Sequence, residues 1–339
     1  MNIFNGFKLK LSLLVLFFCQ CACINIIVAQ TEFHPTGRLV DAGGHKLHIN
    51  VIGKGSPTVI FENGSGDFSF IWSLVQPDVS KITRTVSYDR AGYAWSEPGP
   101  TPRTAHQISA ELHTALINAG INPPYILVGQ SFGGFLVRNF ARYYPNEVAG
   151  MVLVEALNEN SRILIGGKPM RIREWASGRV PPDPQLKFRN NITTGNVSVP
   201  LDTTMEFPLT NLPDSIKKLQ VWAQSQPVYR AASDSEMNWS PEDVENLYEN
   251  RGKAGYTLGN IPLIVLTRGS GGFEGRQDSA ELENERLAMQ EELAGLSSNS
   301  KHIVDKNSGH NIHLEDPKIV ISAIEEVIQA VRTKRPLKK

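Results

Sequence analysis

The chain contains very little cysteine, and this scarcity limits its chemistry. Only three of its 339 residues are cysteine, and Cys19, Cys21 and Cys23 all lie within the first 30 residues. If that leading segment is removed, the remaining chain can form no disulfide and no cysteine-based metal or thiol site. Such a chain must rely on its hydrophobic core, and about 300 residues are enough to build one.

The chain also lacks a net charge. Lys plus Arg and Asp plus Glu each total 34, which gives a formal net charge of +0. No overall field therefore attracts nucleic acid, and we expect no nucleic-acid partner. The basic C-terminal tail, residues 334–339, is short, and we interpret it as solvated. We find no internal repeat and no low-complexity tract.

Long apolar runs are scarce, and the most apolar one lies near the N-terminus. Lys8 and Lys10 precede LSLLVLFF, and the small residues of IVA follow. This order predicts a secretory signal peptide over residues 1–29, cleaved after Ala29, and hence a secreted or periplasmic protein with no stable membrane span. The alternatives are an uncleaved membrane anchor, for which the run is short, and lipid attachment at Cys23.

Short apolar runs alternate with helical patterns along the rest of the chain. The runs 58–61, 83–89, 125–130, 150–156, 262–267 and 301–307 predict buried strands, and 37–43 with 46–53 predicts an antiparallel edge hairpin. Helical patterns occupy 104–120, 285–296 and 316–331, the first with Ile108, Leu112, Leu116 and Ile117 on one stripe. This alternation predicts an α/β fold, a doubly wound and mostly parallel sheet with helices on both faces.

The alternation is interrupted at 157–260, which separates two parts of the predicted core, 30–156 and 261–333. The segment is rich in aromatic residues, so we interpret it as a structured helical lid over the sheet rather than a linker. Its second half predicts a helix that starts at Ser240 as N-cap, with Pro241 in the first turn and an apolar face of Val244, Leu247 and Tyr248.

Ser131 lies between a predicted strand and a predicted helix, in the sequence Gly129-Gln130-Ser131-Phe132-Gly133. A serine in so tight a strand-to-helix turn is forced into a strained backbone conformation, and glycines two residues away relieve the crowding. The turn raises the hydroxyl above the sheet edge and directs the helix N-terminus at it. A plain glycine-serine turn is the alternative, but the flanking strand and helix favour a nucleophile.

With these residues in place, the chain resembles the serine α/β-hydrolase superfamily, particularly its lid-bearing members. The resemblance also rests on IFENGSGD (60–67), SYDRAGYAWSEPG (87–99) and NSGHNIHLEDP (307–317), in this order, and it covers residues 37 to 333. Similar haloalkane dehalogenases and epoxide hydrolases carry an aspartate where this chain has Ser131. The resemblance implies catalysis by a serine, a histidine and an acid, without a metal or an organic cofactor.

The resemblance places the catalytic base at His310, which directly follows a strand and lies in a glycine-containing loop; His313 is the local alternative. Glu155, at the carboxyl end of the strand before the insert, is our candidate for the acid; the alternative role is a structural one, in which it pairs with an arginine or a backbone group of the lid. Glu274 and Asp278, which follow the next strand, are the alternatives. Each choice keeps the chain order of serine, acid and histidine.

Two backbone N–H groups are needed to bind an oxyanion. We expect one from Phe132, after the nucleophile, and one from Ser65 in the Asn63-Gly64-Ser65 turn, where similar hydrolases commonly show His-Gly. A plain turn is the alternative for the second. We interpret Asp89 and Arg90, after another strand, as bracing their loop rather than contacting substrate.

These residues predict an exported serine hydrolase that cleaves a small-molecule carboxylic ester, or an amide or lactone, through an acyl-enzyme. Two rival functions remain open at this point. The same residues can transfer acyl groups to another acceptor, as in similar acyltransferases and perhydrolases, or the fold can serve as a non-catalytic binding protein.

Overall fold

The computed structural model describes residues 33–176, 205–250, 257–269 and 271–337. The predicted signal peptide, 1–29, therefore lies outside the described residues, as do parts of the 157–260 insert. All helices and strands below belong to one unit, Pro35–Lys339. Among the described helices, none has both the length and the apolar character that crossing a bilayer requires.

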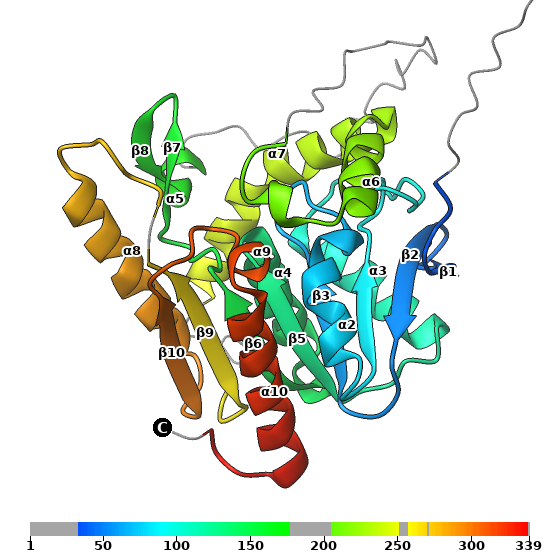
Figure 1. Ribbon diagram of the computed structural model, residues 1–339. Helices are drawn as coiled ribbons and strands as arrows, with labels where there is room; N and C mark the ends of the chain where they lie inside the picture. The colour runs from blue at the N-terminus through cyan, green and yellow to red at the C-terminus, as the bar shows by residue number, and fades with distance from the viewer. Residues whose placement is uncertain (1–32, 177–204, 251–256, 270, 338–339) are drawn as a thin grey trace, which may run out of the picture. The chain divides into compact units, whose positions relative to one another are not determined.

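An eight-stranded sheet forms the centre of this unit (Figure 1). Its strand order is β1-β2-β4-β3-β5-β6-β9-β10. The bounds are β1 Arg38–Asp41, β2 Lys46–Ile52, β3 Thr58–Glu62, β4 Thr85–Tyr88, β5 Tyr125–Gln130, β6 Val148–Val154, β9 Leu263–Arg268 and β10 Ser300–Asp305. Strand β2 is antiparallel to both of its neighbours, and the remaining pairs are parallel. The predicted doubly wound sheet with an antiparallel edge hairpin is confirmed.

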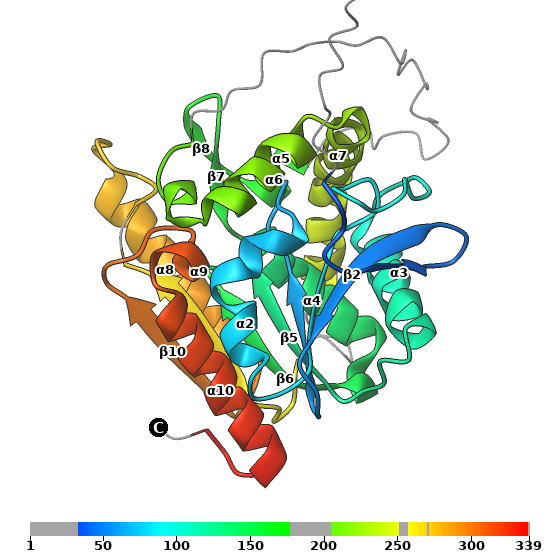
Figure 2. The same ribbon diagram turned by 45° about the vertical axis from the view of Figure 1, so that its right-hand side comes forward.

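Two layers of helices bury the sheet on both faces (Figure 2). The bounds are η1 Ser69–Leu74, α2 Gln76–Val79, α3 Ala105–Asn118, α4 Phe132–Tyr143, η2 Pro145–Glu147, α8 Ser279–Ala294, α9 Ile312–Glu315 and α10 Pro317–Thr333. Helices α2 and α10 pack on one face, and α3, α4 and α8 pack on the other. Because both faces are covered, strands β3, β4 and β5 are buried along their whole length, and β3 and β5 consist largely of apolar residues.

The insert leaves the sheet after β6 and returns at β9, and these two strands pair directly, with Val152 opposite Ile264. Its described elements are β7 Arg162–Ile165, β8 Lys168–Arg171, α5 Ile172–Ala176, η3 Leu209–Asn211, α6 Asp214–Gln224 and α7 Pro227–Glu249. They lie beyond the carboxyl ends of the parallel strands, at the top of Figure 1. The described elements of the insert therefore face the end of the sheet that carries the loops after β3, β5, β6 and β10.

The prediction that a helix begins at Ser240 was wrong. Helix α7 begins at Pro227 and carries Pro241 in its interior. Proline cannot donate the N–H that the carbonyl of Met237 would normally accept. The hydroxyl of Ser240 donates to that carbonyl instead, at 3.0 Å. The helix thus continues through the proline, and Asp243 accepts the N–H of Ala105, at the start of α3, rather than capping its own helix.

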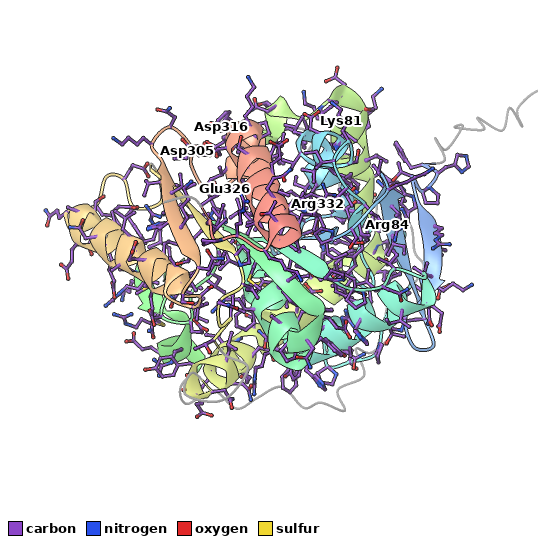
Figure 3. All side chains as sticks on the ribbon, turned by 90° about the horizontal axis from the view of Figure 1, so that it is seen from below. Lys81, Arg84, Asp305, Asp316, Glu326 and Arg332 are labelled. Atoms are coloured by element: carbon purple, nitrogen blue, oxygen red, sulfur yellow. The ribbon has the colours of Figure 1, made fainter. Side chains whose placement is uncertain are left out.

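Helix α10 runs to the end of the sheet where β3 and β4 begin, and Arg332 near its C-terminus bonds to the chain there (Figure 3). Asp316 caps its N-terminus by accepting the N–H of Ile319 at 3.3 Å. Near its C-terminus, Arg332 donates to the carbonyls of Ser56 and Ile82, at 3.1 and 3.0 Å. Both ends of the last helix are therefore fixed, and so is the loop that precedes it.

The apolar stripe predicted on α3 was correct except for Ile117. Ile108, Leu112 and Leu116 are buried, whereas 45% of Ile117 is exposed. Consecutive residues of a helix point about 100° apart, so Ile117 lies outside the face that Leu116 buries.

This neighbouring pair provides a matched test of the core. We expect Leu116→Ala to lower the free energy of unfolding by about 2–5 kcal/mol, because it leaves a cavity beneath α3. Ile117→Ala should change it by less than about 1 kcal/mol. Urea unfolding followed by circular dichroism measures both, and equal losses would contradict the placement of α3.

Candidate active site

The backbone at Ser131 is strained, with φ 53° and ψ −120°. Glycines on both sides permit this conformation. A Cβ on Gly129 would lie 2.5 Å from the carbonyl oxygen of Gly133, and a Cβ on Gly134 would lie 2.3 Å from the Cβ of Ala156. Neither contact is tolerable, so the turn between β5 and α4 requires glycine at these positions. A non-glycine residue held at positive φ is a common feature of functional sites.

The N-terminus of α4 packs directly against the loop that follows β3. A Cβ on Gly133 would lie 2.5 Å from the carbonyl oxygen of Glu62 and 2.6 Å from that of Asn63. Phe132 is the first residue of α4, so its N–H has no acceptor within the helix. The amide of Phe132 therefore lies at the start of the helix beside Ser131 without a partner inside that helix.

A cavity of about 310 Å³ opens at this edge of the sheet, and Ser131, Glu155 and His310 all line it. They come from three different strand ends, those of β5, β6 and β10. Phe132 and Ser65 are not among the lining residues. Ser65 is exposed, and its hydroxyl points to the sulfur of Met237 in α7, at 3.3 Å.

Glu155 has a second strained backbone, with φ 42°, immediately after β6. Its carboxylate is held by two arginines. The N–H of Arg268 donates to Oε2 at 2.8 Å, and Nη1 of Arg286 donates to Oε1 and Oε2 at 3.1 and 3.3 Å. Burial raises the pKa of Glu155, and Arg286 and the backbone N–H of Arg268 oppose this rise. The carboxylate thus has partners, which a charge at a buried strand end requires.

The two alternative acids are placed differently. Glu274 is exposed and accepts the N–H of Gly272 within its own loop, at 2.9 Å. Asp278 pairs with Arg276 at 2.8 Å. Neither lines the cavity that contains Ser131. Of the three candidate acids, Glu155 alone shares this cavity with Ser131 and His310.

The loop that carries His310 is fixed from both sides. Gln130, the residue before Ser131, donates from Nε2 to the carbonyl of His310 at 3.2 Å. The carboxylate of Glu315 accepts the N–H groups of Gly309 and Asn311, at 2.8 and 3.2 Å. The strand that precedes Ser131 and the loop of His310 are therefore connected directly through Gln130.

The imidazole of His310 borders the cavity, and the residue remains exposed to solvent. Partial desolvation by the surrounding protein, together with the positive charges of Arg268 and Arg286, lowers its pKa from 6.5 to about 4. His310 is therefore neutral at neutral pH, the state in which an imidazole can accept a proton. In the described part of the chain, no hydrogen bond joins its ring to Ser131 or Glu155.

His313, the alternative base, is a core residue. It is fully buried, its ring packs 4.9 Å from that of Trp72, and it does not line the cavity. Burial, with a smaller contribution from His310, lowers the pKa of His313 to about 3. Among the described residues, neither of its ring nitrogens has a hydrogen-bond partner. The side chain of His313 therefore anchors the loop of His310 in the core.

Arg90 holds the loop after β3. Its guanidinium is fully buried and donates from Nη1 to the carbonyl of Asn63 and from Nη2 to that of Gly64, both at 2.9 Å. In a trans peptide the N–H of the next residue points away from the carbonyl. Arg90 therefore directs the N–H groups of Gly64 and Ser65 away from itself. The interpretation of Arg90 as a loop brace is confirmed.

Two buried carboxylates balance Arg90. Nη1 donates to Glu62 at 2.9 Å, and Nε donates to both oxygens of Glu236, at 3.0 and 3.1 Å. Glu236 belongs to α7 of the insert and also accepts the hydroxyl of Tyr93 at 2.8 Å. Asp89 accepts the N–H of Ser69 and contacts Nδ1 of His48, each at 2.7 Å. Arg90 thus joins the insert to the loop that is predicted to bind the oxyanion.

Sequence analysis did not identify several of these residues. Arg268 stands at a buried strand end, the same signal that identified Glu155, and Gln130 lies inside the nucleophile motif. Arg286 and Glu236 lie on helices far from the motifs, with no sequence signal for their contacts. Among the described residues, no group of three or more histidine, cysteine, aspartate or glutamate side chains is arranged to hold a metal ion.

Comparisons with known proteins agree with this fold. Residues 57–259 match the family model described as the alpha/beta hydrolase fold. The chain is 26% identical over 336 residues to a probable transporter, efuK, of Hormonema carpetanum, covering 90% of this chain but 44% of that protein. It is also 26% identical over 275 residues to the uncharacterized protein YqjL of Bacillus subtilis, covering 81% of this chain and 85% of YqjL.

A solved structure is similar as well. The fold resembles that of a thermophilic esterase from Thermogutta terrifontis, with a TM-score of 0.58 and 19% sequence identity. The match covers 87% of this chain and 98% of the esterase. At this identity the likeness concerns the fold.

The two arginines beside His310 make its titration testable. We expect the ring protons of His310 to titrate with a pKa of about 4, well below the ordinary 6.5. Arg286→Gln should raise this pKa, because it removes one of the positive charges that disfavour the imidazolium. Proton NMR of the histidine rings measures both values, with His310→Asn assigning the signal.

Arg142→Gln is the control for this measurement, because Arg142 pairs with Asn246 on the surface, away from the cavity. It should leave the titration of His310 unchanged. An ordinary pKa in the unmodified protein, or equal shifts in both variants, would contradict the described surroundings of His310.

Proposed function

The chain belongs to the alpha/beta hydrolase fold family, and we propose that it is an exported serine hydrolase that cleaves carboxylic esters. One observation carries this proposal. Ser131, held at φ 53° between β5 and α4, lines the same cavity as a neutral histidine and a buried glutamate. A serine, an imidazole and a carboxylate meeting in one cavity is the arrangement that acyl transfer through a covalent intermediate requires.

Ser131 attacks the ester carbonyl in the first step. A serine hydroxyl is a weak nucleophile until a base accepts its proton. His310 is that base, and the same ring then donates the proton to the departing alcohol. In the second step a water, deprotonated by His310, attacks the acyl-enzyme; the bond to Ser131 breaks, the acid is released, and His310 returns the proton to the oxygen of Ser131. Hydrogen bonds between catalytic groups often tighten only when substrate is bound. The lack of a hydrogen bond between Ser131 and the ring of His310 in the described structure is therefore compatible with these two steps.

Glu155 orients the imidazole and stabilises the imidazolium that forms during attack. An ionised carboxylate can accept about four hydrogen bonds. The backbone N–H of Arg268 and Nη1 of Arg286 use only part of this capacity, so Glu155 can also accept the Nδ1 proton of His310. The two guanidiniums favour the ionised form of Glu155, which its burial opposes.

The oxyanion of the tetrahedral intermediate binds to the N–H groups of Phe132 and Ser65. The position of Phe132 at the start of α4 supports the first assignment. The second is supported by Arg90, which holds the carbonyls of Asn63 and Gly64 and so turns the N–H of Ser65 to the other side of the loop. Fixed donors of this kind lower the barrier because they need no rearrangement as charge develops.

The size of the cavity and the N-terminal segment supply the rest of the proposal. About 310 Å³ is at the small end of the usual range for ligand sites, which favours a small-molecule ester. The chemistry above uses only groups of the protein and water, so it needs no cofactor. The order of charged, apolar and small residues in 1–29 supports export.

The nucleophile can be tested without knowing the substrate. We expect a fluorophosphonate probe to label the unmodified protein covalently and not to label Ser131→Ala, because the probe reacts with an activated serine. Mass spectrometry locates the labelled residue. If the folded protein takes up no label, the proposal fails and a binding role on the same fold is favoured.

The acid can be tested by two matched variants. Glu155→Gln should lower kcat for a p-nitrophenyl ester by about 10²–10⁴-fold, since the imidazolium loses its carboxylate. Glu274→Gln should stay within about threefold of the unmodified protein, since Glu274 bonds only within its own loop. Circular dichroism checks that both variants fold. Near-normal turnover of Glu155→Gln with loss in Glu274→Gln would reverse the assignment.

A further inference from the structure

The wall of the cavity contains more guanidinium groups than carboxylates. Arg162, Arg268 and Arg286 line it, together with Glu155 and Glu285. Glu155 is already shared, because it lies 3.4 Å from Nε of Arg268 and 3.1 Å from Nη1 of Arg286. These two arginines have a second common partner in Glu283, at 3.4 and 2.7 Å. The positive charges of Arg268 and Arg286 are therefore balanced by Glu155 and Glu283.

Arg162, in β7, is balanced less completely. Its Nε lies 2.7 Å from Glu285, which is also paired with Arg171 of β8. The remaining carboxylate near Arg171, Glu174, is 3.6 Å away and 60% exposed, so solvent screens it. Among the described residues, Glu285 is thus the carboxylate that pairs with both arginines of the hairpin, and Asp278 interacts with Arg162 only at longer range. Arg162, unlike Arg171, lines the cavity.

The unused donors of Arg162 have a defined geometry. Its contact with Glu285 engages Nε, and in the described part of the chain Nη1 and Nη2 form no hydrogen bond. These two nitrogens form the end-on fork of the guanidinium, which matches the two oxygens of a carboxylate. The side chain is 32% exposed and borders the cavity, so a ligand can reach the fork.

The other lining residues indicate the chemical character of the spacer that would connect such a carboxylate to the ester. Ile163 and Leu164 of β7, with Phe273, Leu282 and Met289, give the cavity an apolar side. We infer that the substrate is an ester with a second, ionised carboxylate on a short apolar spacer, and that Arg162 binds this carboxylate while Ser131 attacks the ester. This inference rests on the proposed function and extends it to a substrate class.

The test compares charged and neutral substrates of the same length. Monoethyl esters of four-, five- and six-carbon dicarboxylic acids are paired with ethyl esters of the matching monocarboxylic acids. We expect kcat/KM to be about tenfold or more higher for the charged partner of at least one pair. Arg162→Gln should bring this ratio close to one, mainly through KM, because a contact remote from the reacting bond contributes uniform binding.

Arg171→Gln is the matched control, since Arg171 pairs with the same Glu285 but does not line the cavity; it should keep the preference. The ratio within each variant cancels losses common to both substrates. Arg162→Lys, which keeps the charge without the fork, should retain an intermediate preference, and added salt should weaken the preference only where a charge remains at 162.

A ratio near one at every spacer length in the unmodified protein overturns the inference, and so does equal loss in Arg162→Gln and Arg171→Gln. Labelling of Ser131 by the fluorophosphonate probe separates this failure from failure of the proposed function. Labelled protein without a charge preference rejects the substrate class alone. Ester hydrolysis that persists in Ser131→Ala rejects the function itself.

Discussion

The arrangement of the site depends on the hydrogen bonds and ion pairs formed by the buried guanidinium of Arg90. It binds two carbonyls of the loop after β3 and balances two carboxylates, Glu62 from the sheet and Glu236 from the insert. Removing one member of such a buried group leaves an uncompensated charge, which typically costs about 3–5 kcal/mol. The sheet, the loop and the insert are therefore held in one geometry. An insert that shifted would disturb the loop predicted to bind the oxyanion.

A second set of contacts fixes the opposite side of the site. Gln130 ties the strand of Ser131 to the loop of His310, and Glu315 holds that loop from α9. Arg286 reaches from α8 to Glu155 at the end of β6. Ser131, His310 and Glu155 are thus held by contacts between different elements. Their relative positions depend on how the loops at this end of the sheet pack together. The lowered pKa of His310 follows from its neighbours, because partial desolvation and two nearby arginines disfavour its protonated form.

The insert completes the wall of the cavity. Its β7–β8 hairpin contributes Arg162, Ile163 and Leu164 to the cavity, while ion pairs through Glu285 hold the hairpin on α8. The core supplies Ser131, His310 and Glu155 to the cavity, and the hairpin supplies the guanidinium of Arg162 and an apolar surface. This separation explains how one sheet can support many substrates, since a change in the insert alters what enters the cavity without moving Ser131.

The sequence by itself determined the strands, their mostly parallel order, the edge hairpin and the strained turn at Ser131. These depend on local pattern: continuous apolar runs, a glycine pair, and a serine between glycines that no larger residue can replace. Only the tertiary structure decided that α7 continues through Pro241, that Ile117 points outward, that His313 is a core residue, and that Arg286 and Glu236 belong to the site. Those outcomes rest on contacts between residues far apart in the chain, and a local pattern carries no record of which distant side chains will meet.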